Sequence, residues 1–262
     1  MNHPTPDDAI LELDRVSKSF DGTAALTKVV VAFESGTITA LVGPNGAGKT
    51  TLFNVCSGFL QADLGIVRFG KKDITRRSPD AIARMGLART FQTPRVFYNL
   101  TVLQNTIIPL QRSAQESLSY ALNPFVRHSD EPLEAKAQGL LGRFDLHSLS
   151  GQCAYELSYG QLKILQLVRT VLLSPQVLLL DEPTAGLFPE LRSRVLGFLK
   201  ELVAEGQTVV LIEHNLETVR EVAARTVVMN HGEIMAEGPT DDVLARRQVR
   251  DLFRGSNDNA NS

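Results

Sequence analysis

The sequence predicts an α/β protein in which a mostly parallel sheet carries an added antiparallel β layer and an inserted α-helical subdomain. Two segments, Val177–Leu180 and Thr208–Ile212, are apolar without alternation, which is typical of strands buried on both faces of a parallel sheet. Residues 10–16 alternate between apolar and polar, as strands with one exposed face do. From Thr93 to about Arg169 helical periodicity dominates instead.

A glycine-rich stretch, Gly43–Thr51, has the spacing G-x-x-x-x-G-K-[ST] of loops that hold nucleotide phosphates. The residues expected at this site are Gly43, Pro44, Asn45, Gly46, Ala47, Gly48, Lys49, Thr50 and Thr51. Glycines let bare backbone N–H groups approach an anion, and the helix that follows adds its positive N-terminal dipole. We expect Lys49 to reach the β- and γ-phosphates of ATP and the Thr50 hydroxyl to bind Mg²⁺. A glycine-rich turn without function is the alternative, but the strand and helix predicted on either side favour a P-loop NTPase (RecA-like) core.

Composition limits the remaining function classes. The chain has 262 residues, 43% of them hydrophobic, and a formal net charge of −2, which gives no reason to expect nucleic-acid binding. The two cysteines lack metal-type spacing, so a disulfide framework is not expected. No apolar run approaches the roughly 18 residues of a membrane span, and the N-terminus lacks a signal-peptide pattern. If the protein acts at a membrane, we therefore expect it to do so by binding a partner protein.

The predicted elements follow from local patterning. Alternation and buried apolar runs predict strands at 10–16, 29–33, 37–42, 65–70, 87–91, 177–182, 208–212 and 226–229. Helical periodicity and capping residues predict helices at 50–56, 79–84, 101–110, 132–144, 161–172, 189–205 and 215–224. Turns are expected at Asp21-Gly22 and at Asn230-His231-Gly232. The polar segment 111–130 is predicted as a loop with a short helix near residues 118–122.

We therefore expect one domain over residues 1–254. Its core comprises about residues 8–92 and 170–254, and the helical subdomain comprises about residues 93–169. A basic, helix-prone segment holding Arg246, Arg247, Arg250 and Arg254 closes the domain, and the polar residues 255–262 are expected to be disordered.

Polar residues at strand ends complete the predicted nucleotide site. Asp181 ends an apolar strand, where a carboxylate can hold Mg²⁺ through water, and Glu182 can orient or deprotonate the attacking water. His214 follows the next strand and could donate to the γ-phosphate, although a loop role is as common. Gln92 could contact Mg²⁺ or water, with an exposed amide as the alternative. Phe20 could stack on adenine or belong to the core.

The segment Leu157–Gln161 opens a helix with a second possible anion site. The Ser158 side chain and the Gly160 N–H lie at the predicted helix N-terminus. On its own this is an ordinary helix cap. Because it lies in the helical subdomain, far along the chain from the P-loop, it makes sense as part of the site of another copy.

In this order and spacing, Gly43–Thr51, Gln92, Leu157–Gln161, Val177–Glu182 and His214 resemble the nucleotide-binding subunit of an ATP-binding cassette (ABC) transporter. The resemblance implies a head-to-tail dimer of two such subunits over two ATP molecules. The four residues Ser158, Tyr159, Gly160 and Gln161 of one subunit would face the γ-phosphate that is held by the other. It also implies that Phe20 stacks on adenine, Glu182 is the catalytic base, His214 is the switch histidine and Gln92 is the link to the membrane partner.

Two residues depart from the family pattern. Tyr159 stands where a glycine is usual, and Phe188 stands where the loop after Glu182 usually carries an aspartate. The first leaves the Gly160 N–H available for phosphate. The second removes a carboxylate that normally crosses the dimer interface, so the symmetry of the two sites is in doubt and a heteromeric pair is favoured.

Finer features resemble the ATPases of bacterial branched-chain amino-acid uptake systems and of related urea or amide importers. These are Ala88–Gln92, the insert before Asp130, the Leu-Ser-Tyr-Gly-Gln segment and Ile212–Asn215. The resemblance implies permease subunits in the membrane, a periplasmic binding protein and a place on the cytoplasmic face of the inner membrane. The expected permease contact is the apolar patch Val96, Phe97, Tyr98 and Leu100 beside Gln92, with a local satellite core as the alternative.

Three other functions remain open at this point. A lipopolysaccharide-type exporter ATPase is similar in the core but lacks the insert at Gln111–Asp130. A soluble ABC ATPase acting on ribosomes or DNA usually has two cassettes or long coiled coils, and this chain has no sustained heptads. A small-molecule P-loop kinase leaves Leu157–Gln161 unexplained.

Overall fold

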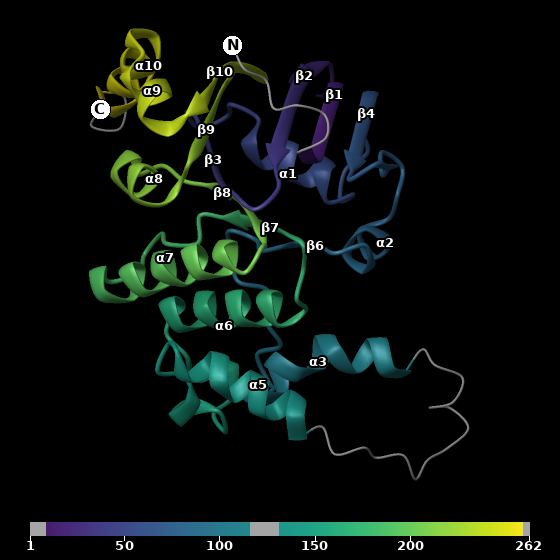
Figure 1. Cartoon of the computed structure of the whole chain (residues 1–262), viewed down its shortest axis with the longest axis vertical. Coiled ribbons are helices and arrows are strands. Elements are labelled where there is room, and N and C mark those ends of the chain that lie inside the picture. The colour runs from purple at the N-terminus through teal and green to yellow at the C-terminus, as the bar shows by residue number, and fades with distance from the viewer. Residues whose placement is uncertain (1–8, 116–130, 259–262) are drawn as a thin grey trace. The chain divides into compact units, whose positions relative to one another are not determined.

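A computed structural model describes residues 9–115 and 131–258 of the chain (Figure 1). The chain divides into two compact units. Unit 1 comprises Met1–Arg89, Gln176–Glu182 and Leu196–Ser262, and unit 2 comprises Thr90–Pro175 and Pro183–Val195. The grouping of Pro183–Val195 with unit 2 was not predicted from the sequence. Helix α7 (Pro189–Ala204) begins in this segment and ends in unit 1.

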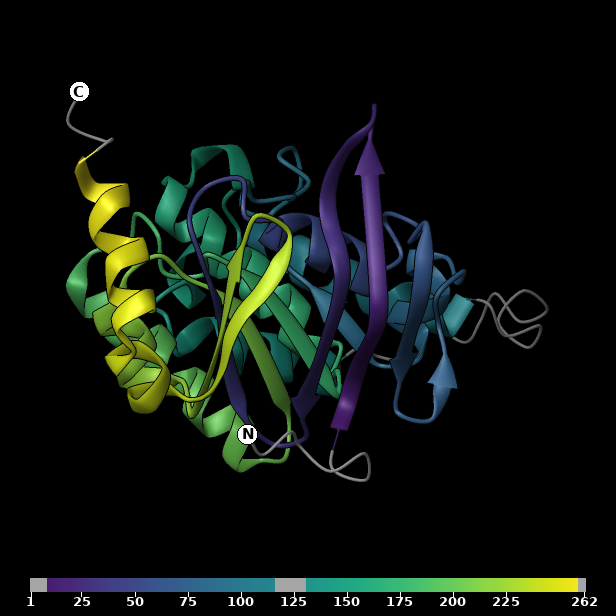
Figure 2. The ribbon, with the colours of Figure 1, turned by 90° about the horizontal axis from the view of Figure 1, so that it is seen from above.

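Unit 1 contains a four-stranded antiparallel sheet in the order β2-β1-β4-β5. Its strands are β1 (Ala9–Phe20), β2 (Thr23–Glu34), β4 (Leu64–Phe69) and β5 (Lys72–Asp73). The two long strands β1 and β2, drawn in purple, run side by side in Figure 2. They are joined by the turn at Asp21-Gly22, as predicted. The two-residue strand β5 is too short to leave a pattern in the sequence, and we did not predict it.

Both long strands extend beyond the predicted ranges because bulges reset their register. Arg15 and Lys28 have positive φ angles of 49° and 46°. The pairing of β1 with β2 shifts between Leu13 and Val16. A bulge inserts one residue without ending the strand, so the alternation breaks while the ladder continues. The sequence pattern therefore ended at Val16, whereas the strand continues to Phe20.

A six-stranded sheet in the order β10-β9-β3-β8-β7-β6 forms the rest of the β structure of unit 1. Its strands are β3 (Ile38–Val42), β6 (Leu87–Arg89), β7 (Val177–Asp181), β8 (Thr208–Ile212), β9 (Arg225–Asn230) and β10 (Glu233–Pro239). β3, β7 and β8 are buried at every residue and pair in parallel, which confirms the prediction from their unbroken apolar runs. β10 pairs antiparallel with β9 through the predicted turn and is the edge strand on this side of the sheet (Figure 2).

Two of the described helices of unit 1 begin after residues with a side-chain cap, Ser78 and Asn215. α1 (Lys49–Cys56) follows the P-loop. α2 (Pro79–Arg84) begins after Ser78, whose Oγ accepts a hydrogen bond from the Ala81 N–H at 3.3 Å. The other helices of this unit are α8 (Leu216–Val222), α9 (Thr240–Ala245) and α10 (Arg247–Asp258). Helix α10 thus covers residues 255–258, for which polar composition had led us to expect disorder.

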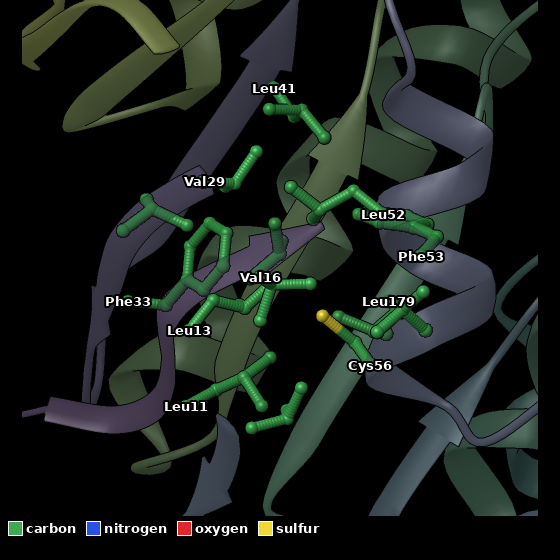
Figure 3. Packing of buried hydrophobic residues seen from close by; sticks show 14 of the residues in the cluster. Leu11, Leu13, Val16, Val29, Phe33, Leu41, Leu52, Phe53, Cys56 and Leu179 are labelled. Atoms are coloured by element: carbon green, nitrogen blue, oxygen red, sulfur yellow. The ribbon is translucent and has the colours of Figure 1, made fainter. Parts of the chain in front are cut away.

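One hydrophobic core joins the two sheets of unit 1 with helix α1 (Figure 3). Leu13 from β1, Phe33 from β2 and Leu179 from β7 point toward Phe53 and Cys56 of α1, and all five side chains are buried. Burial of large apolar side chains is worth about 1.5–3 kcal/mol each. The core therefore holds α1, and with it the P-loop, against the strands that end at the site.

Unit 2 is mainly helical. Its helices are α3 (Val102–Gln115), α5 (Glu131–Gly142), α6 (Tyr159–Leu172) and the first residues of α7, with short 3₁₀ turns at His147–Leu149 and Ala154–Glu156. α3, α5 and α6 contact one another around a small buried cluster of Ile107, Ala137 and Leu172. This arrangement agrees with the helical texture of the sequence between residues 93 and 169.

Two predicted boundaries were wrong. β6 ends at Arg89 and not at Phe91. α3 continues through Gln115, so residues 111–115 are helical and not the loop that we expected from Gln111. Polarity suggested a loop there, but Gln, Arg and Ala are good helix formers, and the helix tolerates the internal Pro109. The short helix expected near residues 118–122 lies outside the described residues.

The two cysteines should differ sharply in reactivity. Cys56 is fully buried in the core, and burial raises the pKa of its thiol to about 12, while Cys153 is partly exposed. Because the thiolate is the reactive form, the native protein should react with one equivalent of a thiol reagent and the unfolded protein with two. Mass spectrometry of labelled peptides checks this. Rapid labelling of Cys56 in the native protein would contradict the burial of the α1 face.

Candidate functional site

The P-loop connects β3 to α1 and depends on glycine at two close approaches. Gly43 has φ of 154°, and a Cβ placed there would lie 2.2 Å from the Met229 carbonyl oxygen. Gly48 has φ of 98°, and its Cβ would lie 2.5 Å from the carbonyl oxygen of Ala25. Real Cβ atoms do not come this near to backbone oxygens. The loop is therefore held against β2 and β9 by contacts that only glycine permits.

Lys49, the first residue of α1, reaches back over this loop. Its Nζ donates hydrogen bonds to the Gly43 carbonyl at 2.7 Å and the Pro44 carbonyl at 2.8 Å. Burial lowers the pKa of Lys49 from 10.5, while the charges of Glu182 and Asp181 act in the opposite direction. The ammonium group thus sits inside the loop, within electrostatic range of both carboxylates.

Asp181 is the last residue of β7, as predicted, and its side chain is almost completely buried. Burial raises the pKa of its carboxyl group, and the nearby Arg89 guanidinium opposes that change. Arg89 and Asp181 approach to 3.5 Å, with side-chain exposures of 4% and 5%. The sequence pattern placed Arg89 in the segment Ala88–Gln92, but we assigned it no role from the sequence. A charged residue at the end of a buried strand was the signal that could have identified it.

Glu182 adopts an uncommon backbone conformation directly after β7. Its φ is 49°, a left-handed value that non-glycine residues rarely adopt and that tends to occur at functional sites. Its N–H donates to the Ile212 carbonyl at 3.1 Å, and its Oε1 lies 2.6 Å from His214 Nε2. The fold therefore joins the two side chains that the sequence placed after neighbouring strands.

A cavity of about 400 Å³ opens beside this cluster in unit 1. It is lined by Gly43, Pro44, Asn45, His214, Asn215, Leu216, Glu217 and Phe253. The size is that of a small-ligand site. Sequence reasoning missed Phe253, because α10 was expected only as a basic tail. Phe20, at the end of β1, is 43% exposed, which argues against the alternative that it belongs to the core.

The predicted second anion site is the N-terminus of α6 in unit 2. Ser158 is the N-cap, and its Oγ accepts a hydrogen bond from the Gln161 N–H at 3.3 Å. The Gln161 Oε1 accepts in turn from the Ser158 N–H at 2.8 Å. This capping box leaves both side chains engaged with the helix's own backbone. A Cβ at Gly160 would lie 3.3 Å from Leu187, so this position favours the smallest residue.

Removing this cap should weaken unit 2 without affecting nucleotide affinity of the isolated subunit. We expect Ser158→Ala to lower the free energy of unfolding by about 0.5–2 kcal/mol, the usual cost of losing an N-cap. Thermal unfolding with and without ATP measures both effects. An unchanged melting temperature would show that the capping box contributes nothing to stability.

Gln92 lies in the irregular segment after β6, and its carbonyl accepts a hydrogen bond from the Tyr159 hydroxyl at 3.2 Å. The departure at Tyr159 thus gives unit 2 a contact between α6 and the Gln92 segment. Within unit 1, the structure brings together Lys49, Asp181, Glu182 and His214. Ser158, Gly160 and Gln92 belong to unit 2.

The segment after Gln92 exposes aromatic side chains on a fixed backbone. Phe97 and Tyr98 are 50% and 48% exposed, which argues against a satellite core, while Val96 and Leu100 are partly buried. The fully buried Asn105 holds this segment. Its Nδ2 donates to the Phe97, Leu100 and Thr101 carbonyls, and its Oδ1 accepts from the Phe97 N–H. Sequence reasoning missed Asn105.

The donor chemistry in unit 1 fits a magnesium ion. Mg²⁺ is usually bound through one or two carboxylates together with the phosphates of the substrate. The Thr50 hydroxyl and the Asp181 carboxylate are oxygen donors of this kind. The described residues contain no cluster of three or more histidines, cysteines or carboxylates that could hold a metal by themselves.

Among the described residues, none of the helices is long and apolar enough to cross a membrane.

The chain is similar to ATP-binding proteins of ABC transporters over most of its length. The family model described as ABC transporter matches residues 26–185. The "Probable branched-chain amino acid transport ATP-binding protein LivG" of Archaeoglobus fulgidus is 37% identical over 249 residues, covering 95% of this chain and 96% of the relative. The high-affinity branched-chain amino acid transport ATP-binding protein BraF of Pseudomonas aeruginosa is 32% identical, covering 94% and 98%.

Solved structures show the same similarity in three dimensions. A nucleotide-free ATP-binding cassette from an ABC transporter superposes with a TM-score of 0.81 at 35% identity, covering 94% of this chain and 98% of that one. An ATP-binding cassette of an ABC transporter in its ADP conformation gives a TM-score of 0.80 at 36% identity, covering 94% and 99%.

Proposed function

Since this chain belongs to the ABC transporter family, as an ATPase subunit that binds ATP and couples its hydrolysis to transport, we propose that it powers the import of branched-chain amino acids or a similar small solute. The observation that carries the ATPase chemistry is the cluster of Lys49, Asp181, Glu182 and His214 around the P-loop. The solute is supported by relatives named for branched-chain amino acid transport that match over 94–95% of the chain.

In this proposal the P-loop backbone and Lys49 hold the phosphates of ATP. The loop glycines allow N–H groups to approach the phosphate oxygens, and the N-terminus of α1 adds a favourable dipole. Lys49 is already inside the loop, so little side-chain freedom is lost when it binds phosphate. Phe20 is exposed at the end of β1 and available to stack on the adenine ring.

Thr50, Asp181 and Gln92 are the proposed ligands of Mg²⁺, directly or through water. When bound, the ion neutralises charge on the β- and γ-phosphates. Asp181 contributes a nearly buried carboxylate at the end of β7. Gln92 lies in unit 2, at the start of the segment that is proposed to contact the permease.

Glu182 is the proposed general base for the attacking water, and His214 its partner. The 2.6 Å contact between Glu182 Oε1 and His214 Nε2 orients the carboxylate. General-base catalysis requires a carboxylate within hydrogen-bond reach of the water in a suitable pose. The left-handed backbone at Glu182 supports this role, because strained residues persist where the surrounding structure holds them for function.

The α6 N-terminus is proposed to complete the ATP site of a second subunit, identical or related. Ser158, Tyr159, Gly160 and Gln161 would contact the γ-phosphate held by the partner. Phe188, the residue before α7, is 80% exposed, and an apolar side chain of this size gains from burial in an interface. Because it replaces a usual aspartate, we propose that the pair is heteromeric in the cell.

The proposed membrane partners are permease subunits that dock on the segment with Gln92, Val96, Phe97, Tyr98 and Leu100. Exposed Phe97 and Tyr98 on a backbone pinned by Asn105 support this surface. A periplasmic binding protein would act indirectly by delivering the solute. The protein would then lie peripherally on the cytoplasmic face of the bacterial inner membrane.

Capture from membranes of the host tests this proposal. Tagged Glu182→Gln protein is incubated with Mg-ATP and detergent-solubilised membranes, and bound proteins are identified by mass spectrometry. We expect the captured proteins to include two multi-span permease subunits and a second ATPase. We expect the matched control, Lys49→Ala protein, not to retain them. Components of a lipopolysaccharide exporter would overturn the import assignment. Ribosomal proteins without any membrane protein would overturn the transport assignment for this chain.

A further inference from the structure

Arg89 occupies a position that the proposed reaction does not yet use. It is the last residue of β6, and its side chain is 4% exposed, so its charge is almost fully removed from water. A buried charge is costly unless hydrogen bonds and opposite charge compensate it. The contacts of its guanidinium group show where this compensation comes from.

One side of the guanidinium is attached to the helix that follows the P-loop. Arg89 Nη1 donates hydrogen bonds to Asn54 Oδ1 at 2.6 Å and to the Oγ of Ser57, the C-cap of α1, at 3.2 Å. Its Cζ lies 5.6 Å from the centre of the Phe53 ring, close enough for a cation–π contact. All three partners belong to α1 or its C-cap, and the same helix carries Lys49 and Thr50 at its N-terminus.

The other side of the group faces the strand that carries the proposed metal carboxylate. Arg89 Nη2 lies 3.5 Å from Asp181 Oδ2. A single planar group thus spans α1 and β7. Arginine can do this because its donors diverge in a fixed fork, whereas the ammonium group of lysine is a single point charge.

We propose that Arg89 is a positioning residue that fixes Asp181 relative to α1, so that the carboxylate and the Thr50 hydroxyl keep the spacing that a Mg²⁺–nucleotide complex needs. This inference rests on the proposed function, which assigns Asp181 and Thr50 to the metal. Groups that orient metal ligands typically contribute roughly 10–100-fold to metal affinity. The effect of Arg89 should therefore appear in the metal-dependent part of nucleotide binding.

The test measures ADP affinity by calorimetry, once with MgCl₂ and once with EDTA. The ratio of the two dissociation constants is the Mg²⁺-dependent gain. For Arg89→Lys, which keeps the charge and removes the fork, we expect this gain to fall by roughly 10-fold or more, with metal-free ADP affinity unchanged. Asn54→Ala keeps Arg89 itself and removes one anchor, so it should reduce the gain in the same direction and to a smaller extent.

Arg84→Lys is the matched control, because Arg84 forms an exposed ion pair with Asp80 on α2. It should leave the Mg²⁺-dependent gain at the parent value. An unchanged gain in both Arg89→Lys and Asn54→Ala would overturn the proposal. An equal loss of metal-free and Mg²⁺-bound affinity would also overturn it, since that result indicates a general structural role.

A third variant separates this inference from the assignment beneath it. Asp181→Asn should abolish the Mg²⁺-dependent gain, and adding Arg89→Lys to it should cause no further loss. If Asp181→Asn keeps the gain, the metal assignment of the proposed function is wrong, and the role of Arg89 is lost with it. If Asp181→Asn loses the gain while Arg89→Lys and Asn54→Ala keep it, only the inference about Arg89 is wrong.

Discussion

Replacing Glu182 with glutamine should lower the ATPase rate by roughly 10²–10⁴-fold, the usual contribution of a positioned general base, while ATP binding is retained. Glutamine has nearly the same shape, and the backbone bond from Glu182 N–H to the Ile212 carbonyl does not depend on the side chain. The replacement therefore removes the proton acceptor and the carboxylate charge while the backbone stays in place. Steady-state phosphate release and equilibrium ATP binding measure the two quantities separately.

The same variant should also accumulate an ATP-bound dimer, because we expect bound ATP to draw two subunits together and its hydrolysis to let them separate. Size-exclusion chromatography with Mg-ATP and a second ATPase subunit, or at high concentration of this chain alone, reports the dimer. Glu205→Gln is a suitable control, since Glu205 is an exposed residue just after α7. If Glu182→Gln hydrolyses ATP at the parent rate, Glu182 is not the base.

Replacing Gly43 with alanine should cause the largest loss of stability and of ATP binding among the P-loop substitutions considered. The new Cβ would lie 2.2 Å from the Met229 carbonyl oxygen and 3.3 Å from the Ala47 Cβ, and the backbone would stay in a glycine conformation. Overpacking costs about 1–3 kcal/mol, and an unfavourable backbone conformation costs about 1–3 kcal/mol more. The loop can relieve this clash only by moving away from β9. That movement displaces the carbonyls that accept hydrogen bonds from Lys49.

Gly46→Ala is the matched control for this prediction. Gly46 has φ of 79° but nothing within 4 Å of the added Cβ, so the change introduces backbone strain without a clash. We expect its unfolding free energy to fall by about 1–2 kcal/mol, as for a single left-handed residue, and that of Gly43→Ala to fall by clearly more. Equal losses in chemical denaturation would show that strain alone, and not contact with Met229, makes Gly43 necessary.

Local sequence was sufficient for three strands of the six-stranded sheet, β3, β7 and β8, and for the P-loop. β3, β7 and β8 were predicted because strands buried on both faces are mostly apolar without alternation, and that pattern is visible without any tertiary contact. The P-loop was predicted because phosphate binding needs glycine and lysine at a fixed spacing within one turn of chain. Caps such as Ser78 and Ser158 were visible for the same reason, since each acts within three residues of itself.

Contacts between distant segments decided the rest. The pairing of Glu182 with His214 depends on the order of β7 and β8 in the sheet, and residue type alone left His214 undecided. Arg89 gained its partners because β6 places it between α1 and Asp181, which are 32 or more residues away in sequence. Bulges at Arg15 and Lys28 extended two strands past the point where alternation fails. Thus the sequence by itself determined which groups could bind phosphate, whereas tertiary packing determined which of them meet, because a contact between remote residues leaves no periodic pattern in either segment.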